Sequence, residues 1–210
     1  MKNSKRNTGE QFCWIDTIDV ANTPPELSSM YEQVGATHGQ VHNLYRAFSL
    51  QPRPLISADQ HYRDILHNDS NQSAPWFLEL LAIQAAIIAD CDYALTNHGA
   101  NFKVLLGDAE KSEIMLQAVR EDNFDNDIFT CKESVFLTYA AKLCRSPEKM
   151  TQTDIETLRR AGATDTEILE AVQATSCFAY WVRFINALGI QSGNEAVGLF
   201  DESGNRRGSD

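Results

Sequence analysis

The sequence predicts an all-α fold, a single compact domain of about eight helices with short connections. Over most of the 210 residues, apolar side chains recur every three to four positions, which is the spacing of an amphipathic helix. No stretch alternates apolar and polar residues between hairpin-type turns, as a strand of an antiparallel sheet would. Threonine or serine ahead of an acid, and glycine after the last apolar residue, divide the chain into segments.

Polar, turn-rich segments stand at both ends of the chain. We expect residues 1–11 and 201–210 to be flexible tails on either side of one helical domain at 12–200.

Three short helices are expected in the first third of the domain. The first covers 23–34, with Thr23 as N-cap, prolines in the first turn and Gly35 as its stop. An apolar-faced segment at 41–50 is the second, and 54–66 is the third, with apolar residues at helical spacing.

A strongly apolar run follows, from Ser73 to about Phe102. Ser73 is the expected N-cap, and Pro75 stands in the first turn, where its missing N–H does no harm. Gly107 and Asp108 end the turn that follows this run.

The C-terminal half predicts four more helices, at 108–119, 127–147, 151–162 and 164–189. The first begins with acids, which the helix dipole favours. The last two each start at a threonine with an acid close behind and stop at a glycine.

Charge and hydropathy restrict the classes of function. The net charge is −11 and the pI is about 4.9, which argues against binding to nucleic acids or to anionic membranes. No window of eighteen apolar residues is present, and the polar N-terminus lacks the apolar core of a secretion signal. We therefore expect a cytoplasmic protein that acts on small molecules.

The cysteines are odd in number, widely separated and never spaced as CxxC, which makes a zinc ribbon an unsuitable interpretation. In a reducing cytoplasm most should be free thiols that pack as small apolar side chains. They are Cys13, Cys91, Cys131, Cys144 and Cys177. Only Cys91 has neighbours that suggest chemistry.

Three reactive side chains interrupt the apolar run: Glu79, Cys91 and His98. Cys91 and His98 are seven residues apart, so on one helix they lie within ~20° of the same face and ~10 Å apart along the axis. Glu79 would point ~120° away from Cys91 and lie ~18 Å distant on an unbroken helix. These groups can meet only if the helix breaks, and the sequence "ADCD" at 89–92 is the natural place.

A new helix with Asp90 as N-cap would put Cys91 in its first turn, where the partial positive charge of the helix end favours thiolate over thiol. His98 would then face into the fold from the second turn. Glu79, on the preceding helix, could orient His98 or accept its proton.

The chain reproduces the spacing E-x11-C-x2-C-x3-H, with Glu79, Cys91, position 94 and His98 at the four fixed positions. This pattern resembles the motif of the alkylhydroperoxidase D-like, peroxidase-related branch of the carboxymuconolactone decarboxylase family. The resemblance extends over about residues 15–189, through "PPELSSMYEQVGATHGQVHNLYRAFSLQPRPL" and, later, "MTQTDIETLRRAGATDTEILEAV" with "VRFINALG". It implies the helical fold of that family.

The resemblance also implies an antioxidant oxidoreductase, but Ala94 departs from the pattern. In the family's peroxidases two cysteines reduce a hydroperoxide through a disulfide cycle, and the cysteine nearer the histidine attacks. Ala94 occupies that position, so a peroxidase would need Cys91 to attack and an external thiol or a distant cysteine to resolve it.

The family's other branch suggests an alternative, a cofactor-free lyase or isomerase. His98 would then be the general base on a small organic acid or lactone, and Ala94 would leave room for the substrate. Arg46, His42 and Arg183 are the candidates for binding its carboxylate. A further alternative is a catalytically degenerate binding or scaffold protein.

The other histidines, His38, His42, His61 and His67, are expected at the surface or at helix ends. No metal site and no cofactor are expected, because Glu79, Cys91 and His98 lack a fourth ligand. The broad apolar helix faces and the family resemblance predict a homo-oligomer. Aromatic side chains are expected in the core or in subunit contacts: Trp76, Tyr180, Trp181 and Phe184.

Overall fold

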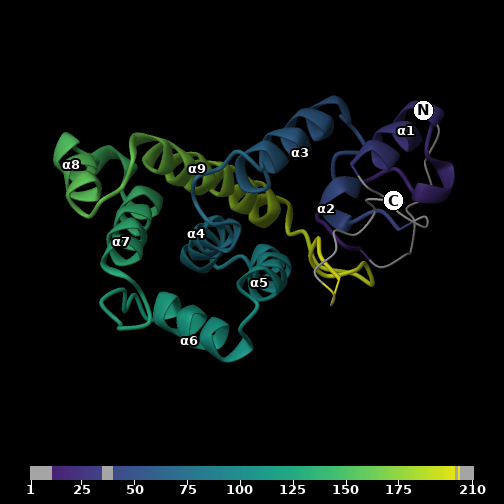
Figure 1. Ribbon diagram of the computed structural model, residues 1–210. Helices are drawn as coiled ribbons and strands as arrows, with labels where there is room; N and C mark the ends of the chain where they lie inside the picture. Colours follow the sequence, from purple (N-terminus) through teal and green to yellow (C-terminus); the bar gives the residue numbers. More distant parts are fainter. Residues whose placement is uncertain (1–10, 35–39, 202, 204–210) are drawn as a thin grey trace.

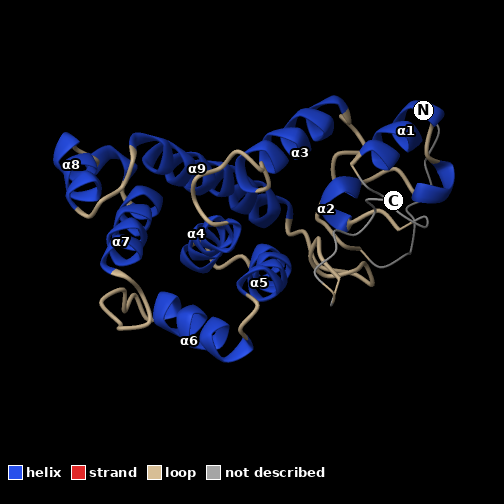
Figure 2. Cartoon of the chain, in the orientation of Figure 1, coloured by secondary structure: helices blue, strands red, loops and turns tan. Residues whose placement is uncertain are grey.

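The computed structural model describes residues 11–34, 40–201 and 203. Within these ranges the chain forms helices and no strand, which confirms the predicted all-α fold (Figure 2). The elements are η1 Val20–Asn22, α1 Pro25–Gln33, α2 Asn43–Arg46, α3 Arg53–Leu66, α4 Pro75–Ile88, α5 Asp92–Leu106, α6 Ala109–Arg120, α7 Cys131–Arg145, η2 Pro147–Lys149, α8 Gln152–Arg160 and α9 Asp165–Leu188.

Some predictions fall outside the described residues. The predicted tails at 1–11 and 201–210 do so almost entirely, and the proposed helix stop at Gly35 and the histidine at position 38 do so as well.

Helix α4 forms the centre of the domain. It packs against α3, α5, α6, α7 and α9, and Figure 1 shows it with the long helix α9 on one side and α5 on the other. Ten of its 14 residues are buried. A helix that is apolar on all sides is buried on all sides, so the only acid in this helix, Glu79, is carried into the interior.

Capping boxes begin three of the helices in the C-terminal half. Thr130, Thr151 and Thr164 each exchange two hydrogen bonds with the acid three residues later. Gly107 and Gly189 end α5 and α9 with φ values of 69° and 58°, in the left-handed region that glycine adopts without strain. The starts predicted at Thr151 and Thr164 and the stop at Gly189 are confirmed, whereas α7 begins at Cys131 and not at the predicted residue 127.

The N-caps predicted at Thr23 and Ser73 are wrong. Pro24, not Thr23, precedes α1, because the Thr23 hydroxyl donates instead to the carbonyl of Val20 (2.7 Å) and closes η1. Ala74, not Ser73, precedes α4. The backbone N–H groups of Gln72 and Ser73, which precede the helix, donate to the buried Glu170 carboxylate of α9, at 2.8 Å each.

The predicted break ahead of Cys91 is confirmed, but the role predicted for Asp90 is wrong. Asp90 has φ 52° and ends α4 in a Schellman-type turn. Its N–H donates to Ile87 (3.1 Å), and that of Cys91 donates to Ala86 (2.9 Å). Cys91 itself is the N-cap of α5. The chain therefore reverses between α4 and α5, which pack side by side.

The stretch after α9 returns to α5 and to residues 12–14. We call residues 190–200 the C-terminal segment; it is drawn in yellow beyond α9 in Figure 1. The N–H of Gln191 donates to the carbonyl of Phe12 (2.9 Å), and the N–H of Trp14 donates to that of Leu188 (2.8 Å). No helix in the described part of the chain is long and apolar enough to cross a membrane.

Candidate active site

Glu79 is a carboxylate with no solvent exposure, and three side chains surround it. Its Oε2 lies 2.7 Å from Nδ1 of His98, and its Oε1 accepts a hydrogen bond from Nδ2 of Asn101 at 3.0 Å. Nε2 of His67 lies 3.4 Å from Oε1. A buried carboxylate is tolerated only when its oxygens are bound in this way, so these side chains form one polar site inside an apolar core.

His98 joins this site from the middle of α5. Its side chain retains 14% exposure, in contrast to Glu79. The edges of the Phe178 and Tyr62 rings pack against it, with centroid distances of 4.5 and 5.7 Å. The predicted contact between Glu79 and His98 is therefore present, with one imidazole nitrogen held by the carboxylate and the ring fixed by aromatic neighbours.

His67 was predicted at the surface or at a helix end, and the first of these is wrong. Its backbone does end α3, but its side chain is only 6% exposed. The Tyr62 hydroxyl lies 2.9 Å from the same Nε2 that approaches Glu79. Burial, followed by the charge of Glu79, raises the pKa of Tyr62 well above its ordinary value of 10.0, so this phenol keeps its proton. No local signal reveals His67, because its burial depends on how α3 packs on α4.

Asn101 is the other site residue that the sequence reasoning missed. It is 1% exposed, and its Oδ1 accepts the N–H of Leu199 (2.7 Å) while its Nδ2 binds Glu79. A signal for it does exist, since residues three apart share a helix face and Asn101 is three residues after His98.

Cys91 lies in a second apolar cluster and is not one of the side chains that surround the Glu79 carboxylate. The buried members of this cluster are Phe12, Cys13, Ala47, Ala86, Cys91, Tyr93, Ala94, Val182, Ile185 and Ile190. Burial raises the pKa of the Cys91 thiol above its ordinary value of 9.0; the backbone N–H of Ala94 lowers it, and Asp92 and Asp90 raise it further. The predicted stabilisation of a thiolate by the helix end is thus outweighed by burial.

Ala94 is 2% exposed in the same cluster. Apolar neighbours surround its methyl group, so the space predicted for a substrate beside it is occupied by packed side chains.

The basic residues predicted to bind a carboxylate occupy three different environments. The Arg46 guanidinium stacks on the Phe12 ring at 4.1 Å and donates to Asn43 Oδ1 (2.9 Å), while its buried Nε has no hydrogen-bond partner among the described residues. His42 is half-buried; burial lowers its pKa, and the charge of Glu195 raises it. Arg183 is exposed and donates to the carbonyl of Ala179 in its own helix (2.6 Å).

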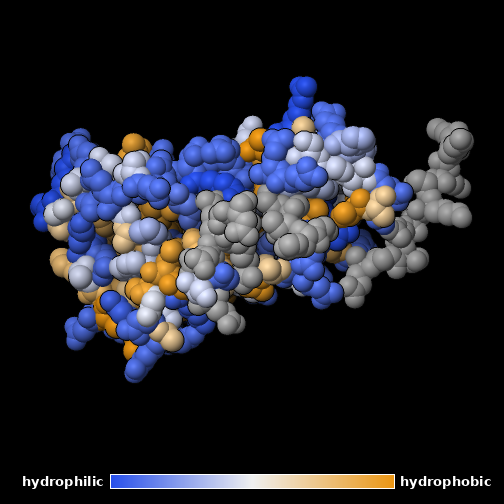
Figure 3. Space-filling model, turned by 45° about the vertical axis from the view of Figure 1, so that its right-hand side comes forward, coloured by the Kyte–Doolittle hydropathy of each residue, from blue (hydrophilic) through white to orange (hydrophobic). Residues whose placement is uncertain are grey.

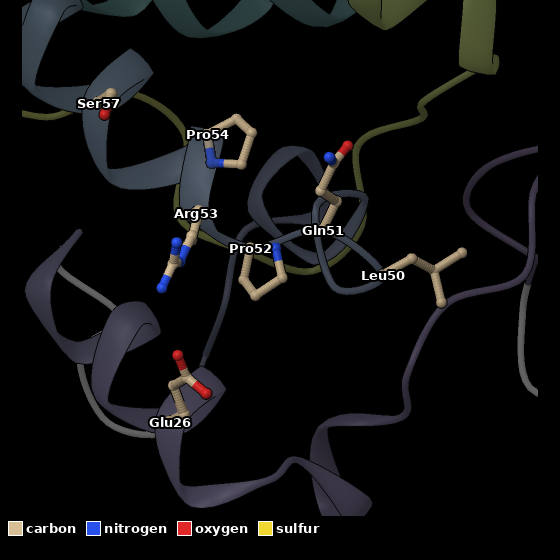
Figure 4. Close-up of a pocket in the computed structure, with 7 residues that line it drawn as sticks. All are labelled: Glu26, Leu50, Gln51, Pro52, Arg53, Pro54 and Ser57. Carbon is tan, nitrogen blue, oxygen red and sulfur yellow. The ribbon is translucent and has the colours of Figure 1, made fainter.

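A surface pocket of about 600 Å³ lies elsewhere, between the start of α1 and the start of α3 (Figure 4). Its walls are Glu26, Leu50, Gln51, Pro52, Arg53, Pro54 and Ser57. Figure 4 shows Glu26 and Arg53 facing each other across it. None of the predicted site residues lines this pocket, and it holds no histidine or cysteine. Within residues 11–34, 40–201 and 203, no three histidine, cysteine or acidic side chains are grouped to hold a metal ion.

Comparisons with known proteins place this geometry in a known fold. No family model matches the sequence, and no curated protein matches it. Among solved structures, a peroxidase-related protein with an alkylhydroperoxidase AhpD core from Ralstonia eutropha JMP134 superposes with a TM-score of 0.72 at 19% identity, over 89% of this chain and 95% of that one.

A peroxidase-related protein from Silicibacter sp. TM1040 gives a TM-score of 0.73 at 23% identity, over 90% of this chain and 96% of that one. The debrominase Bmp8 gives 0.66 at 13% identity, over 90% and 95%. The chain therefore has the alkylhydroperoxidase AhpD-like fold as a single compact domain, and proteins with this fold differ in the activities for which they are named.

Proposed function

We propose that the protein is a small-molecule enzyme in which His98 transfers protons as general base and general acid, with Glu79 orienting its ring. One observation carries this proposal: Nδ1 of His98 lies 2.7 Å from Oε2 of a fully buried carboxylate. A carboxylate at Nδ1 fixes the tautomer that bears its proton there. Nε2 then has a free lone pair, and the proposal needs a substrate to reach it through the 14% of the side chain that stays exposed.

A small organic acid or lactone is the proposed substrate class. Its carboxylate or carbonyl would need a donor, and we propose Arg46, whose buried Nε has no hydrogen-bond partner among the described residues. The buried Tyr31 hydroxyl also lacks a partner among the described residues, and the charge of Arg46 acts on it. Arg46 is proposed for this role because a guanidinium binds carboxylates through charge-assisted hydrogen bonds.

Peroxide reduction at Cys91 is a second candidate, favoured by the two fold neighbours named as peroxidase-related. The Cys91 thiolate would attack the hydroperoxide, releasing an alcohol and leaving a sulfenic acid, which an external thiol would reduce. Ala94 excludes a disulfide with the neighbouring turn. The raised pKa of Cys91 and its apolar surroundings make this the weaker proposal.

The two candidates predict opposite results for two substitutions. For proton transfer, deuterium incorporation from D₂O into a panel of small carboxylic acids and lactones is followed by NMR. His98→Gln should lower the rate about 10² to 10⁴-fold, and Cys91→Ser should leave it unchanged. The exposed His61 provides a matched control, His61→Gln.

For peroxide reduction, consumption of tert-butyl hydroperoxide is measured with dithiothreitol as the external thiol. The proton-transfer proposal is contradicted if the wild-type protein consumes peroxide, Cys91→Ser abolishes this consumption, and no deuterium incorporation is found. Silence of the wild-type protein in both assays would favour the remaining alternative, a binding or scaffold protein.

We also propose a cytoplasmic homo-oligomer. Several large apolar side chains are exposed on the single chain, and Figure 3 shows apolar patches on an otherwise mostly hydrophilic face. They include Trp14 at 69%, Leu50 at 61%, Leu169 at 57% and Tyr180 at 47% exposure. Contact between copies would cover such side chains, and light scattering after size-exclusion chromatography would give the number of subunits.

A further inference from the structure

The C-terminal segment lies directly on the site around Glu79. Residues 198, 199 and 200 each contact a side chain of α5 or a site histidine. The N–H of Gly198 donates to Oδ1 of Asn97 (3.1 Å), and the N–H of Leu199 donates to Oδ1 of Asn101 (2.7 Å). The Phe200 ring meets the His67 ring edge to face at 5.9 Å. These contacts make the segment one wall of the site.

The Asn101 side chain forms hydrogen bonds both to this wall and to the buried carboxylate of Glu79. Its Nδ2 donates to Oε1 of Glu79 and its Oδ1 accepts from Leu199. The primary amide has its oxygen on one side and its nitrogen on the other, and the side chain is 1% exposed, so it cannot turn away without losing both bonds. The two partners are therefore held in a fixed relation to each other.

We propose that Asn101 is a positioning residue that couples the orientation of the Glu79 carboxylate, and through it the His98 ring, to the docking of the C-terminal segment on α5. This inference rests on the proposed function for its catalytic meaning, because Glu79 matters to the reaction only if His98 transfers protons. The coupling itself is a property of the folded protein and is measurable without a substrate.

A substitution at Gly198 can disturb the contact between the segment and Asn101 while no site residue is replaced. It has φ 76°, and a Cβ added to it would lie 2.8 Å from Oδ1 of Asn101 and 3.2 Å from the Cβ of Ala100. Gly198→Ala must therefore separate the segment from Oδ1 of Asn101, by moving the segment, the Asn101 side chain or both. Gly162 offers a matched control, because it also has a positive φ, 90°, but an added Cβ meets nothing within 4 Å. Gly162→Ala thus has the backbone strain without the contact.

The experiment uses the full chain and two NMR readouts, amide hydrogen exchange at Leu199 and the ¹⁵N shifts of the His98 ring. Asn101→Leu, which keeps the side-chain volume, and Gly198→Ala should each speed Leu199 exchange by about 10-fold or more. Both should also shift the His98 ring nitrogens, and Gly162→Ala should leave both readouts at their wild-type values. The shift in Gly198→Ala is decisive, because the substitution leaves every site side chain chemically unchanged and acts at the contact between the segment and Asn101.

The proposal is overturned if Gly198→Ala speeds Leu199 exchange while the His98 shifts stay at their wild-type values, or if Asn101→Leu leaves Leu199 exchange unchanged. If Asn101→Leu does not fold, Gly198→Ala with its Gly162→Ala control still decides the matter. Both readouts are independent of turnover. If both readouts change together in a protein that shows no activity, the coupling is supported and the proposed function is rejected. If the protein is active but the His98 shifts do not follow Leu199 exchange, the proposed function stands and the coupling is rejected.

Discussion

A carboxylate that no solvent reaches can act on its neighbour only through its shape and its charge, and Glu79 supplies both to His98. Glu79→Gln keeps the shape and removes the charge. The introduced amide can still accept from Asn101, and its NH₂ group would then face Nδ1 of His98, so the ring proton should move to Nε2. We expect the rate of proton transfer to fall by at least about 10-fold.

The tautomer is measured directly by long-range ¹H–¹⁵N correlation of the His98 ring. Glu110→Gln, at an exposed glutamate, is the matched control and should leave the ring unchanged. A ring that keeps its Nδ1 proton in Glu79→Gln would show that Glu79 does not set the tautomer.

Cys91 should be slow to react with electrophiles at neutral pH. Because burial raises its pKa above 9.0, the thiolate fraction stays small at pH 7 and grows only as the pH rises past that value. We expect the rate of iodoacetamide alkylation, resolved by peptide mass spectrometry, to keep rising above pH 9. The exposed Cys131 reports on reagent access. A midpoint for Cys91 below 9 would restore the thiolate proposal.

Individual site residues could be predicted as far as they lie on one helix or in one motif. The spacing of Glu79 and His98 predicted their contact once the helix between them was interrupted. His67 could not be predicted, because its contact with Glu79 depends on how α3 lies against α4. The expected thiolate at Cys91 was wrong because the burial contributed by distant residues outweighs the local helix end.

At the scale of elements, the reversal between α4 and α5 depends on one residue in the left-handed region. Asp90 has φ 52°, a conformation that glycine adopts without strain. Asp90→Gly should therefore raise the free energy of unfolding by about 0.5–1 kcal/mol. It should also lower the pKa of Cys91, because the charge of Asp90 contributes to raising that pKa. Urea unfolding and the alkylation profile measure the two effects.

Asp122 is a control with nearly the same backbone, φ 53°. Its carboxylate oxygens accept bonds from Nη2 of Arg145 at 2.9 and 2.7 Å, so Asp122→Gly loses an interaction that offsets the relief of strain. We expect a smaller gain or none. A destabilising Asp90→Gly would show that the aspartate side chain itself holds the turn.

Most elements could be predicted because their signals are local. The capping boxes at Thr130, Thr151 and Thr164 are complete within four residues, and the structure contains all three. Ser73 is not the cap of α4; its N–H and that of Gln72 donate to Glu170, nearly one hundred residues later. Contacts between residues so far apart in the chain cannot be predicted from the local sequence.

The whole molecule should lose stability at alkaline pH. Burial raises the pKa of Tyr31 to about 12 and those of Cys144 and Cys177 to about 11; it also raises the pKa values of Tyr45 and Tyr62. Raised folded-state values favour the protonated forms, so these groups stabilise the fold fully below about pH 9 and lose that contribution as the pH rises through the folded values.

We expect the free energy of unfolding to fall by up to about 1.4 kcal/mol per pH unit for each such group that titrates. Urea unfolding at pH 8, 9.5 and 11 measures this fall. Equal stability at all three pH values would show that these side chains are solvated in the folded protein.

The architecture as a whole could be predicted from periodicity, because burying one face of each helix leaves few arrangements other than an all-α domain. The position of the C-terminal segment could not, since residues 190–200 carry no helical period and are held by separate hydrogen bonds to Phe12, Asn97 and Asn101.

The two hydrogen bonds that join Phe12 to Gln191 and Trp14 to Leu188 bear on how the protein is handled. They join residues 12–14 to the end of α9 and to the C-terminal segment, so changes near residues 12–14 or 188–191 would weaken this connection. The exposed turn around Asp125 and Asp127, between α6 and α7, lies on neither stretch. An epitope inserted there would leave both hydrogen bonds in place and is therefore suited to purification or to surface immobilisation.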